Sequence, residues 1–275
     1  MIRSADPLSR VAFSTLAFPD ATLASAVSLG RRWGYRGVEL RLIDGELIDP
    51  SMPAAERAQV KRALAGLPVV AVDSSIRLTD SDPGPQLRRF LELASDWEAP
   101  VVRVFGGALA ASGPARRGQL RAATRVLESS VPLARRLGVA IGVETHDDFS
   151  SSSVVAQLLE ETDPEWVGAV WDSHHPHRMG ESPADVYANL GGRILLAQVK
   201  DARRTVGDDG DDWELVLLGE GEVPVKEMLR LLAAGGYPNW ISVEWEKRWH
   251  PEIAEPGVAL PQYRSVLAEW MEVSP

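Results

Sequence analysis

Short apolar runs alternate with longer amphipathic stretches along the whole 275-residue chain. In the longer stretches, such as 53–66 and 118–137, apolar residues recur three or four positions apart, which is typical of a helix with one buried face. The short runs have the length and composition of buried strands. They lie at 11–17, 37–42, 69–74, 101–105, 139–144, 167–172, 194–199 and 240–245.

Strands that alternate with helices in this way predict an α/β protein, and eight such strands predict a single (β/α)8 TIM barrel that takes in residues 1–275 as one domain. A doubly wound sheet is the structural alternative, but no GxGxxG fingerprint follows the first predicted strand. Two long polar loops, 173–183 and 202–213, follow the sixth and seventh predicted strands. A TIM barrel carries its active site on the loops at this end of its strands.

The alternation of side chains along the predicted strands singles out four polar residues. Glu144 shares a face with Gly142, Asp172 with Gly168 and Val170, and Glu244 with Ser242, while branched or aromatic residues such as Val143 and Trp245 take the opposite face and are expected to pack on the helices. Gln198 occupies the corresponding place near the end of the seventh predicted strand. All four therefore point into the barrel at the C-terminal ends of successive strands. They are Glu144, Asp172, Gln198 and Glu244.

Three carboxylates that converge in a barrel mouth repel one another unless a cation compensates them. Oxygen-rich ligation suits a hard divalent ion, so the pattern predicts one Mn²⁺ or Mg²⁺ site. The alternative is that each acid separately caps the helix that follows it.

Composition and charge exclude several classes of protein. The chain has 29 Lys and Arg against 39 Asp and Glu, a formal net charge of −10, which argues against binding along a nucleic-acid backbone. It has no Cys, which excludes disulfides, thiolate nucleophiles and Cys-ligated metals. No stretch approaches the roughly 20 apolar residues of a membrane helix, and residues 1–10 lack the apolar segment of a secretory signal. We therefore expect a soluble, cytoplasmic protein with neither nucleic-acid nor membrane partners.

Further charged residues are predicted to point inward. Glu39 and Arg41 share the inward face of the second predicted strand, where they could pair with each other or contact a substrate. Pairing is the favoured prediction, because opposite charges that point inward need partners. Arg103 has the same inward parity on the fourth strand and could either pair with an acid or contact a substrate. His146 either orients Glu144 or is a hydrogen-bonded residue at a strand end.

Five segments in the sequence resemble motifs of the xylose isomerase-like TIM barrels. This superfamily holds sugar isomerases and epimerases, inosose dehydratases, hydroxypyruvate isomerases and family-2 AP endonucleases. The resemblance follows the strand order through nearly the whole chain, but its specific motifs lie in the second half. They are ETHDD (144–148), VWDSHH (170–175), AQVKD (197–201), LGEGEVP (218–224) and VEWEKRWHP (243–251).

The resemblance implies a metal site. In the superfamily a Glu, an Asp, a His and a Glu at the ends of strands five to eight bind one divalent ion, and the matching residues are Glu144, Asp172, Gln198 and Glu244. Gln198 stands where a His is commoner. The amide oxygen favours Mn²⁺ or Mg²⁺ over Zn²⁺ as the cofactor.

The resemblance also implies substrate-binding residues. His175, three positions after the metal-binding Asp, matches a His that supports the metal or binds substrate in many members. Arg204, six positions after Gln198, matches an Arg that holds substrate oxygens in ketose epimerases. A further family Glu is Ser150 in this chain, which argues against a ketose 3-epimerase in particular.

Two residues after the last predicted strand, Lys247 and Trp249, are further candidates for contacts with a sugar at the barrel mouth. With His146, they complete the predicted set of substrate-binding residues. The partner that this set predicts is a small sugar or polyol; a homo-oligomer is compatible with the sequence.

Three carboxylates and one metal ion support proton transfer next to a carbonyl through a metal-stabilised enediolate. Glu144 and Glu244 would flank the ion as the acid and base. We therefore predict a metal-dependent isomerase or epimerase of a sugar or sugar phosphate. An inosose-type dehydratase or lyase begins with the same proton removal and is the alternative.

Two other classes fit less well. An AP endonuclease of this superfamily needs three zinc ions and additional His ligands, yet the third and fourth predicted strands end in Ser74-Ser75 and Phe105-Gly106. A non-catalytic sugar-binding barrel is the remaining alternative, and the metal content separates these classes.

Overall fold

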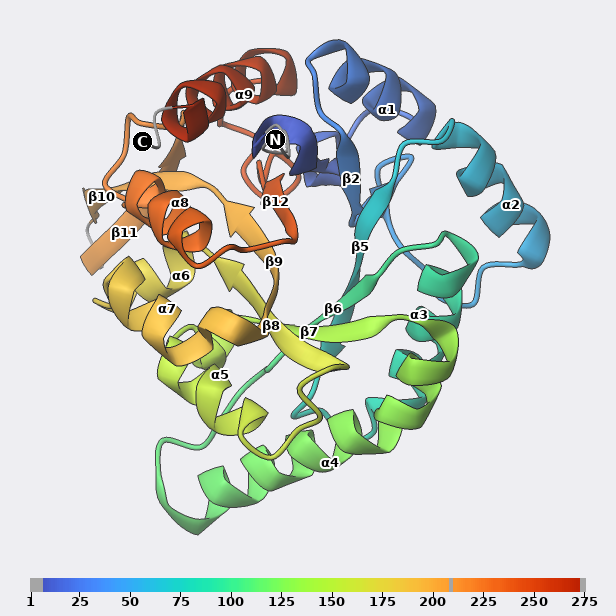
Figure 1. Cartoon of the computed structure of the whole chain (residues 1–275), viewed down its shortest axis with the longest axis vertical. Coiled ribbons are helices and arrows are strands. Elements are labelled where there is room, and N and C mark those ends of the chain that lie inside the picture. Colours follow the sequence, from blue (N-terminus) through green and yellow to red (C-terminus); the bar gives the residue numbers. More distant parts are fainter. Residues whose placement is uncertain (1–6, 208–209, 273–275) are drawn as a thin grey trace, which may run out of the picture.

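The computed structural model describes residues 7–207 and 210–272, and its centre is a closed barrel of parallel strands (Figure 1). All eight predicted strands take part, so the predicted (β/α)8 fold is confirmed. In order around the barrel, the strands are β1(Val11–Ser14), β12(Trp240–Val243), β9(Ile194–Val199), β8(Val167–Asp172), β7(Ala140–Glu144), β6(Val101–Phe105), β5(Val69–Arg77) and β2(Gly37–Leu40).

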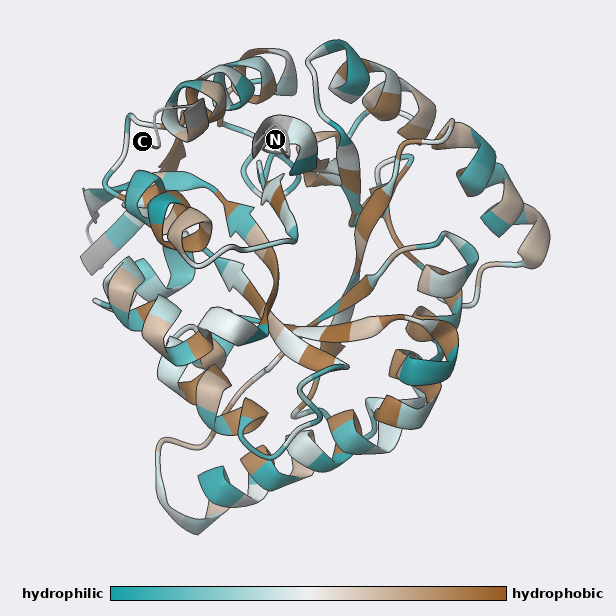
Figure 2. Cartoon of the chain, in the orientation of Figure 1, coloured by the Kyte–Doolittle hydropathy of each residue, from teal (hydrophilic) through white to brown (hydrophobic). Residues whose placement is uncertain are grey.

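Helices surround the barrel (Figure 1), with apolar residues along the strands and many polar residues on the helices (Figure 2). The helices are α1(Leu23–Arg32), α2(Ala54–Ala63), α3(Gly84–Asp96), α4(Gly113–Leu137), α5(Ser152–Leu159), α6(His174–Arg178), α7(Pro183–Leu190), α8(Val225–Ala234) and α9(Pro256–Glu272). Short 3-10 helices are η1(Pro7–Arg10), η2(Thr15–Ala17), η3(Asp147–Phe149) and η4(Gly191–Arg193). No helix within the described ranges has the length and apolar character to cross a membrane.

The structure corrects two sequence-based expectations. The first strand ends at Ser14 rather than continuing to residue 17, because the Ser14 hydroxyl accepts a hydrogen bond from the Leu16 N–H at 3.3 Å and caps η2. The segment 202–213 is largely a hairpin of β10(Asp201–Gly207) and β11(Gly210–Val216), although residues 208 and 209 lie outside the described residues. Its polar side chains pair across the strands, as the Arg203–Glu214 ion pair at 2.8 Å shows.

A second, shorter hairpin of β3(Leu42–Ile43) and β4(Glu46–Leu47) follows β2. The other predicted loop, 173–183, contains α6. Both segments follow the C-terminal end of a barrel strand, the end at which a TIM barrel places its site.

Small residues make room for the core inside the barrel. A Cβ atom on Gly142 would lie 2.7 Å from Val170, and one on Gly168 would lie 2.3 Å from the Arg193 carbonyl oxygen. Because these positions have no side chain, neighbouring apolar side chains can pack closely inside the barrel. They form a compact apolar layer. Its buried members are Ala12, Val70, Ala71, Val101, Val170 and Leu196. The polar strand ends lie beyond this layer.

The packing of α1 against β1 yields a test of the fold. A Cβ atom on Gly30 would lie 2.1 Å from Cε1 of the buried Phe13 ring, so Gly30→Ala should lower the free energy of unfolding by about 1–3 kcal/mol. Gly118→Ala, in α4 with no atom within 4 Å of the new methyl group, should raise it by about 0.4–1 kcal/mol. Denaturant unfolding of the two variants measures both effects. Equal stability of the two variants would contradict the described packing of α1.

Candidate active site

The four predicted metal ligands lie together at the C-terminal end of the barrel. Glu144 and Asp172 are the last residues of β7 and β8, Gln198 lies in β9 beside Asp172, and Glu244 directly follows β12. All four are buried. One carboxylate oxygen from each of Glu144, Asp172 and Glu244 lies within 4.8 Å of the other two.

Several buried oxygens in this group have no hydrogen-bond partner among the described residues. The Gln198 amide nitrogen donates to Glu39 Oε1 at 2.8 Å and to Glu244 Oε1 at 3.2 Å, which leaves the amide oxygen Oε1 without a partner. Glu144 Oε2 and Asp172 Oδ2 make no hydrogen bond in the described part of the chain, but each has an ion-pair partner, Arg103 Nε and Lys200 Nζ respectively, at 3.0 Å. Buried acceptors without partners are costly. Gln198 Oε1 is thus the one of these three oxygens with neither a hydrogen bond nor an ion pair within the described ranges. Carboxylate and amide oxygens are the donors that a hard divalent ion prefers, so the residue types of this group fit such an ion.

Lys200 is a site residue that the sequence analysis missed. Its side chain is 1% exposed, and Nζ lies 3.0 Å from Asp172 Oδ2 and 2.7 Å from Glu244 Oε2. Nζ also contacts Glu246. Lys200 has the same strand parity as Gln198, two positions earlier, so alternation could have placed it inward. In this structure its ammonium group compensates two of the three central carboxylates.

Arg103 compensates the other side of the site. Its guanidinium group lies 3.0 Å from Glu144 Oε2 and 3.4 Å from Asp73 Oδ2. Of its two predicted uses, the structure shows the pairing with acids.

The predicted pairing of Glu39 with Arg41 is wrong. Glu39 instead accepts the hydrogen bond from Gln198, which reaches it across the barrel lumen. Arg41 lies just beyond β2, and its Nη1 donates to the Asp73 carbonyl at 3.3 Å and to the Ser75 hydroxyl at 3.0 Å. The strand neighbour β5 therefore provides the partners of Arg41.

Burial and neighbouring charges separate the carboxyl groups by pKa. Burial raises the pKa of Glu144, and it raises the pKa of Glu244 well above its usual range. Burial also acts to raise the pKa of Asp172, but Lys200 and the nearby histidines outweigh it and lower that pKa. Asp172 is thus the acid most firmly held in its charged form, whereas Glu144 and Glu244 take up a proton more readily.

Two histidines lie beside the carboxylates. His175 Nε2 lies 3.8 Å from Asp172 Oδ1 and 4.0 Å from Glu144 Oε1. Burial holds the pKa of His175 well below its usual range, so the ring is neutral and one nitrogen can accept a proton or a ligand bond. The His146 ring lies 4.5 Å from the His175 ring, and its Nδ1 is 2.9 Å from Asp147 Oδ1, which fixes the ring orientation.

Two adjoining cavities open at the site. The smaller, of about 60 Å³, lies among the acids and is lined by Leu16, Arg41, Arg103, Phe105, Glu144, His146, Lys200, Glu244, Glu246 and Trp249. The larger, of about 420 Å³, shares Glu246 with it and is lined by His174, His175, Arg178, Met179, Arg204, Asp212, Trp213, Leu215, Glu246 and His250. Together they offer room for a small molecule beside the carboxylates.

The predicted substrate-binding residues do not all line the same cavity. His146 and Trp249, which is 48% exposed, line the small cavity, whereas His175 and Arg204 line the large one. The Arg204 guanidinium carbon lies 5.2 Å from the centre of the Trp213 ring, on the opposite strand of the hairpin.

The contacts of Lys247 argue against its predicted role in substrate binding. Its Nζ donates to the carbonyls of Pro251 and Ile253 at 2.7 and 2.6 Å and pairs with Glu255 at 2.8 Å. These contacts use the three donors of an ammonium group. Lys247 therefore anchors the loop after β12, and it lines neither cavity of the site.

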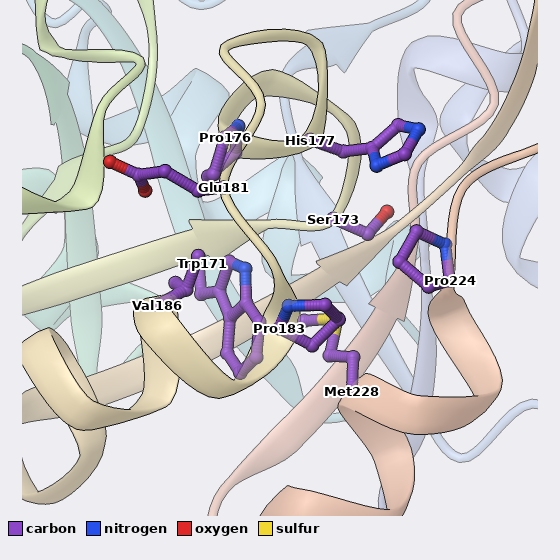
Figure 3. Close-up of a pocket in the computed structure, with 9 residues that line it drawn as sticks. All are labelled: Trp171, Ser173, Pro176, His177, Glu181, Pro183, Val186, Pro224 and Met228. Atoms are coloured by element: carbon purple, nitrogen blue, oxygen red, sulfur yellow. The ribbon is translucent and has the colours of Figure 1, made fainter.

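Figure 3 shows a third cavity, of about 10 Å³, between β8, α7 and α8. Trp171, Val186 and Met228 contribute to its apolar lining, and none of the predicted site residues lines it. Trp171 points into it from the face of β8 opposite to Asp172, as strand alternation predicts. This cavity is too small for a substrate and is part of the packing between barrel and helices.

Comparisons with known proteins agree with this architecture. The chain is 28% identical over 137 residues to inosose dehydratase 2 of Bacillus cereus, a match that covers 45% of each chain and so spans less than half of that relative. Among solved structures it resembles an L-ribulose 3-epimerase, with a TM-score of 0.76 and 15% identity over 96% of this chain and 94% of that one. It also resembles the IOLI protein with a bound zinc atom, with a TM-score of 0.77 and 15% identity over 96% and 98% of the two chains.

At this identity the structural likenesses show the fold alone. A family model described as the xylose isomerase-like TIM barrel matches residues 27–267. Because that match covers most of the chain, the protein belongs to the xylose isomerase-like TIM barrel family.

Proposed function

We propose that this protein is a metal-dependent isomerase or epimerase that transfers a proton next to the carbonyl of a sugar or sugar-derived substrate. The proposal rests on one observation above all: three buried carboxylates converge beside a cavity, and the amide nitrogen of Gln198 contacts one of them, Glu244. In our proposal Glu144, Asp172, Gln198 and Glu244 hold a divalent ion, and the oxygen donors favour Mn²⁺ or Mg²⁺. When bound, the ion would supply positive charge for the substrate oxygens on which negative charge develops.

Glu144 and Glu244 are the proposed acid and base. They come from β7 and from the end of β12, which β8 and β9 separate in the barrel, so they reach the cavity from different sides. One carboxylate removes the proton from the carbon next to the carbonyl, and the other returns a proton to a carbon of the resulting enediolate. Burial raises the pKa of both groups, which suits acids that exchange protons near neutral pH.

The surrounding residues hold these groups in place. Arg103 fixes Glu144 by an ion pair, and Lys200 fixes Glu244. His146 and Trp249 line the small cavity and are the proposed contacts for the substrate there.

Dehydration is a second candidate, because the curated relative cited above is named an inosose dehydratase. It begins with the same removal of a proton. The neighbouring carbon then loses its hydroxyl group, which takes a proton from the second glutamic acid and leaves as water while a carbon–carbon double bond forms. The two reactions differ in whether the second proton goes to carbon or to oxygen.

Replacing Lys200 tests the proposed metal site. Lys200→Met keeps the length of the side chain but removes the charge that competes with a metal ion for Asp172 and Glu244. We expect the variant to bind Mn²⁺ at least about tenfold more tightly than the wild type. It should also unfold at a lower temperature in EDTA, because its carboxylates lack a counter-cation. Calorimetric titration of EDTA-stripped protein with MnCl₂ measures the affinity.

Lys226→Met, at an exposed position of α8, is the matched control and should leave both properties unchanged. Mn²⁺ affinity in Lys200→Met that equals or falls below that of the wild type would refute the competition.

Solvent exchange tests the proposed acid and base. Wild-type protein loaded with Mn²⁺ should incorporate deuterium from D₂O at one carbon of its substrate, within a panel of ketoses, ketose phosphates and inososes followed by NMR. Glu144→Gln and Glu244→Gln should each slow the exchange by about 10²-fold or more, because an amide cannot move the proton. Glu160→Gln, exposed on the outside of the barrel, should exchange like the wild type. Undiminished exchange in both active-site variants would rule out these roles.

A further inference from the structure

Arg41 differs from the other buried cations of the described chain. Four lysine and arginine side chains are buried, Arg41, Arg103, Lys200 and Lys247. Each of the other three has a carboxylate within 4.0 Å. Arg41, 7% exposed, has no ion-pair partner within the ranges that the structure describes. A buried charge without a partner is costly, and such groups commonly meet their partner in a ligand.

The contacts of Arg41 hold it from one side only. Its Nη1 donates to the Asp73 carbonyl and the Ser75 hydroxyl, both neutral acceptors on β5. The remaining nitrogens, Nε and Nη2, make no hydrogen bond to any residue of the described ranges, and the guanidinium carbon lies 5.9 Å from the centre of the Phe105 ring. Arg41 is therefore positioned, yet it keeps one edge of its planar donor group unused.

Arg41 lines the small cavity. That cavity is also lined by Glu144 and Glu244, the proposed acid and base. The acids nearest to Arg41 are already engaged, because Arg103 pairs with Asp73 and Glu144 while Lys200 pairs with Glu244. A neutral sugar hydroxyl in this cavity could accept a hydrogen bond from Arg41 but would leave its charge uncompensated. An anionic oxygen pair would supply both.

We propose that Arg41 binds a carboxylate of the substrate, close to the carbon that exchanges its proton. The small volume of the cavity, about 60 Å³, suits a planar carboxylate next to a hydroxy-carbonyl unit, while the rest of the molecule extends into the 420 Å³ cavity. The substrate class is then a polyhydroxylated oxo-acid rather than a neutral sugar. This inference rests on the proposed function for the position of the reacting carbon, but the binding of the carboxylate does not require turnover.

Three ligands that differ only at carbon 1 test the assignment. D-Fructose carries a hydroxymethyl group there, 2-keto-D-gluconate a carboxylate and D-fructose 1-phosphate a phosphoester; L-sorbose with 2-keto-L-gulonate supplies a second configuration. Calorimetric titration of Mn²⁺-loaded protein should show that the oxo-acid binds at least about tenfold more tightly than the ketose in one or both series. Arg41→Met should remove this preference, because it weakens the binding of the oxo-acid more than that of the ketose.

Arg41→Met removes a charge that has no carboxylate within 4.0 Å, but it also removes the hydrogen bonds to the Asp73 carbonyl and the Ser75 hydroxyl, so its thermal stability is measured beside its ligand binding. Should that variant fail to fold, Arg41→Lys replaces it, since a point charge without the planar fork should retain only part of the preference. Equal binding of oxo-acid and ketose in both series, or a preference unchanged by substitution of Arg41, would overturn the proposal. If D-fructose 1-phosphate bound most tightly and this preference were lost in the Arg41 variants, the anion bound by Arg41 would be a phosphate. That result would also overturn the proposal of a carboxylate.

The binding experiment on Arg41 and the deuterium-exchange experiment on Glu144 and Glu244 can fail independently of each other. Carboxylate selectivity that depends on Arg41, without deuterium exchange in any ligand, would refute the proton transfer and support the binding site. Deuterium exchange in neutral ketoses alone, with no binding preference for oxo-acids, would support the proton transfer and refute the carboxylate-binding site.

Discussion

Electrostatic repulsion among buried acids is the constraint on which the barrel mouth depends. Glu39, Asp73, Glu144, Asp172 and Glu244 are all almost completely buried at one end of the barrel. Arg103 and Lys200 compensate four of these acids, and Glu39 shares the Gln198 amide with Glu244. Without these cations a barrel with so many inward carboxylates would lose much of its stability. The chemistry of the site and the stability of the fold therefore depend on the same ion pairs.

The apolar layer below the acids makes this arrangement rigid. Gly142 and Gly168 let Val170 and Leu195 fill the lumen, so the polar strand ends stand on a closely packed base. The same packing excludes water from the acids on that side. Desolvation then raises the pKa of Glu144 and Glu244, so the core shapes the acid–base properties of the mouth.

The alternation of strands with helices was sufficient to predict the fold, and the alternation of side chains along each strand was sufficient to predict that four polar residues lie at one end of the barrel. It depends only on local geometry, which each strand of the barrel fixes by itself. The choice of partners could not be predicted in this way. Glu39 accepts a hydrogen bond from Gln198, 159 positions away in sequence, because β2 and β9 face each other across the lumen. Arg41 donates to the Asp73 carbonyl of β5, the strand that pairs with β2. The contacts of Lys247 could not be predicted either, because its hydrogen-bond partners lie in an irregular loop and strand alternation says nothing about them.

The hairpin of β10 and β11 has a consequence for how this protein can diversify. It carries Arg204 and Trp213 to the wall of the large cavity, yet its strands pair with each other and with no strand of the barrel. Its length and sequence can therefore change without altering the register of any barrel strand or the spacing of the carboxylates. Mutation can thus change the wall of the large cavity while the arrangement of the buried carboxylates stays the same.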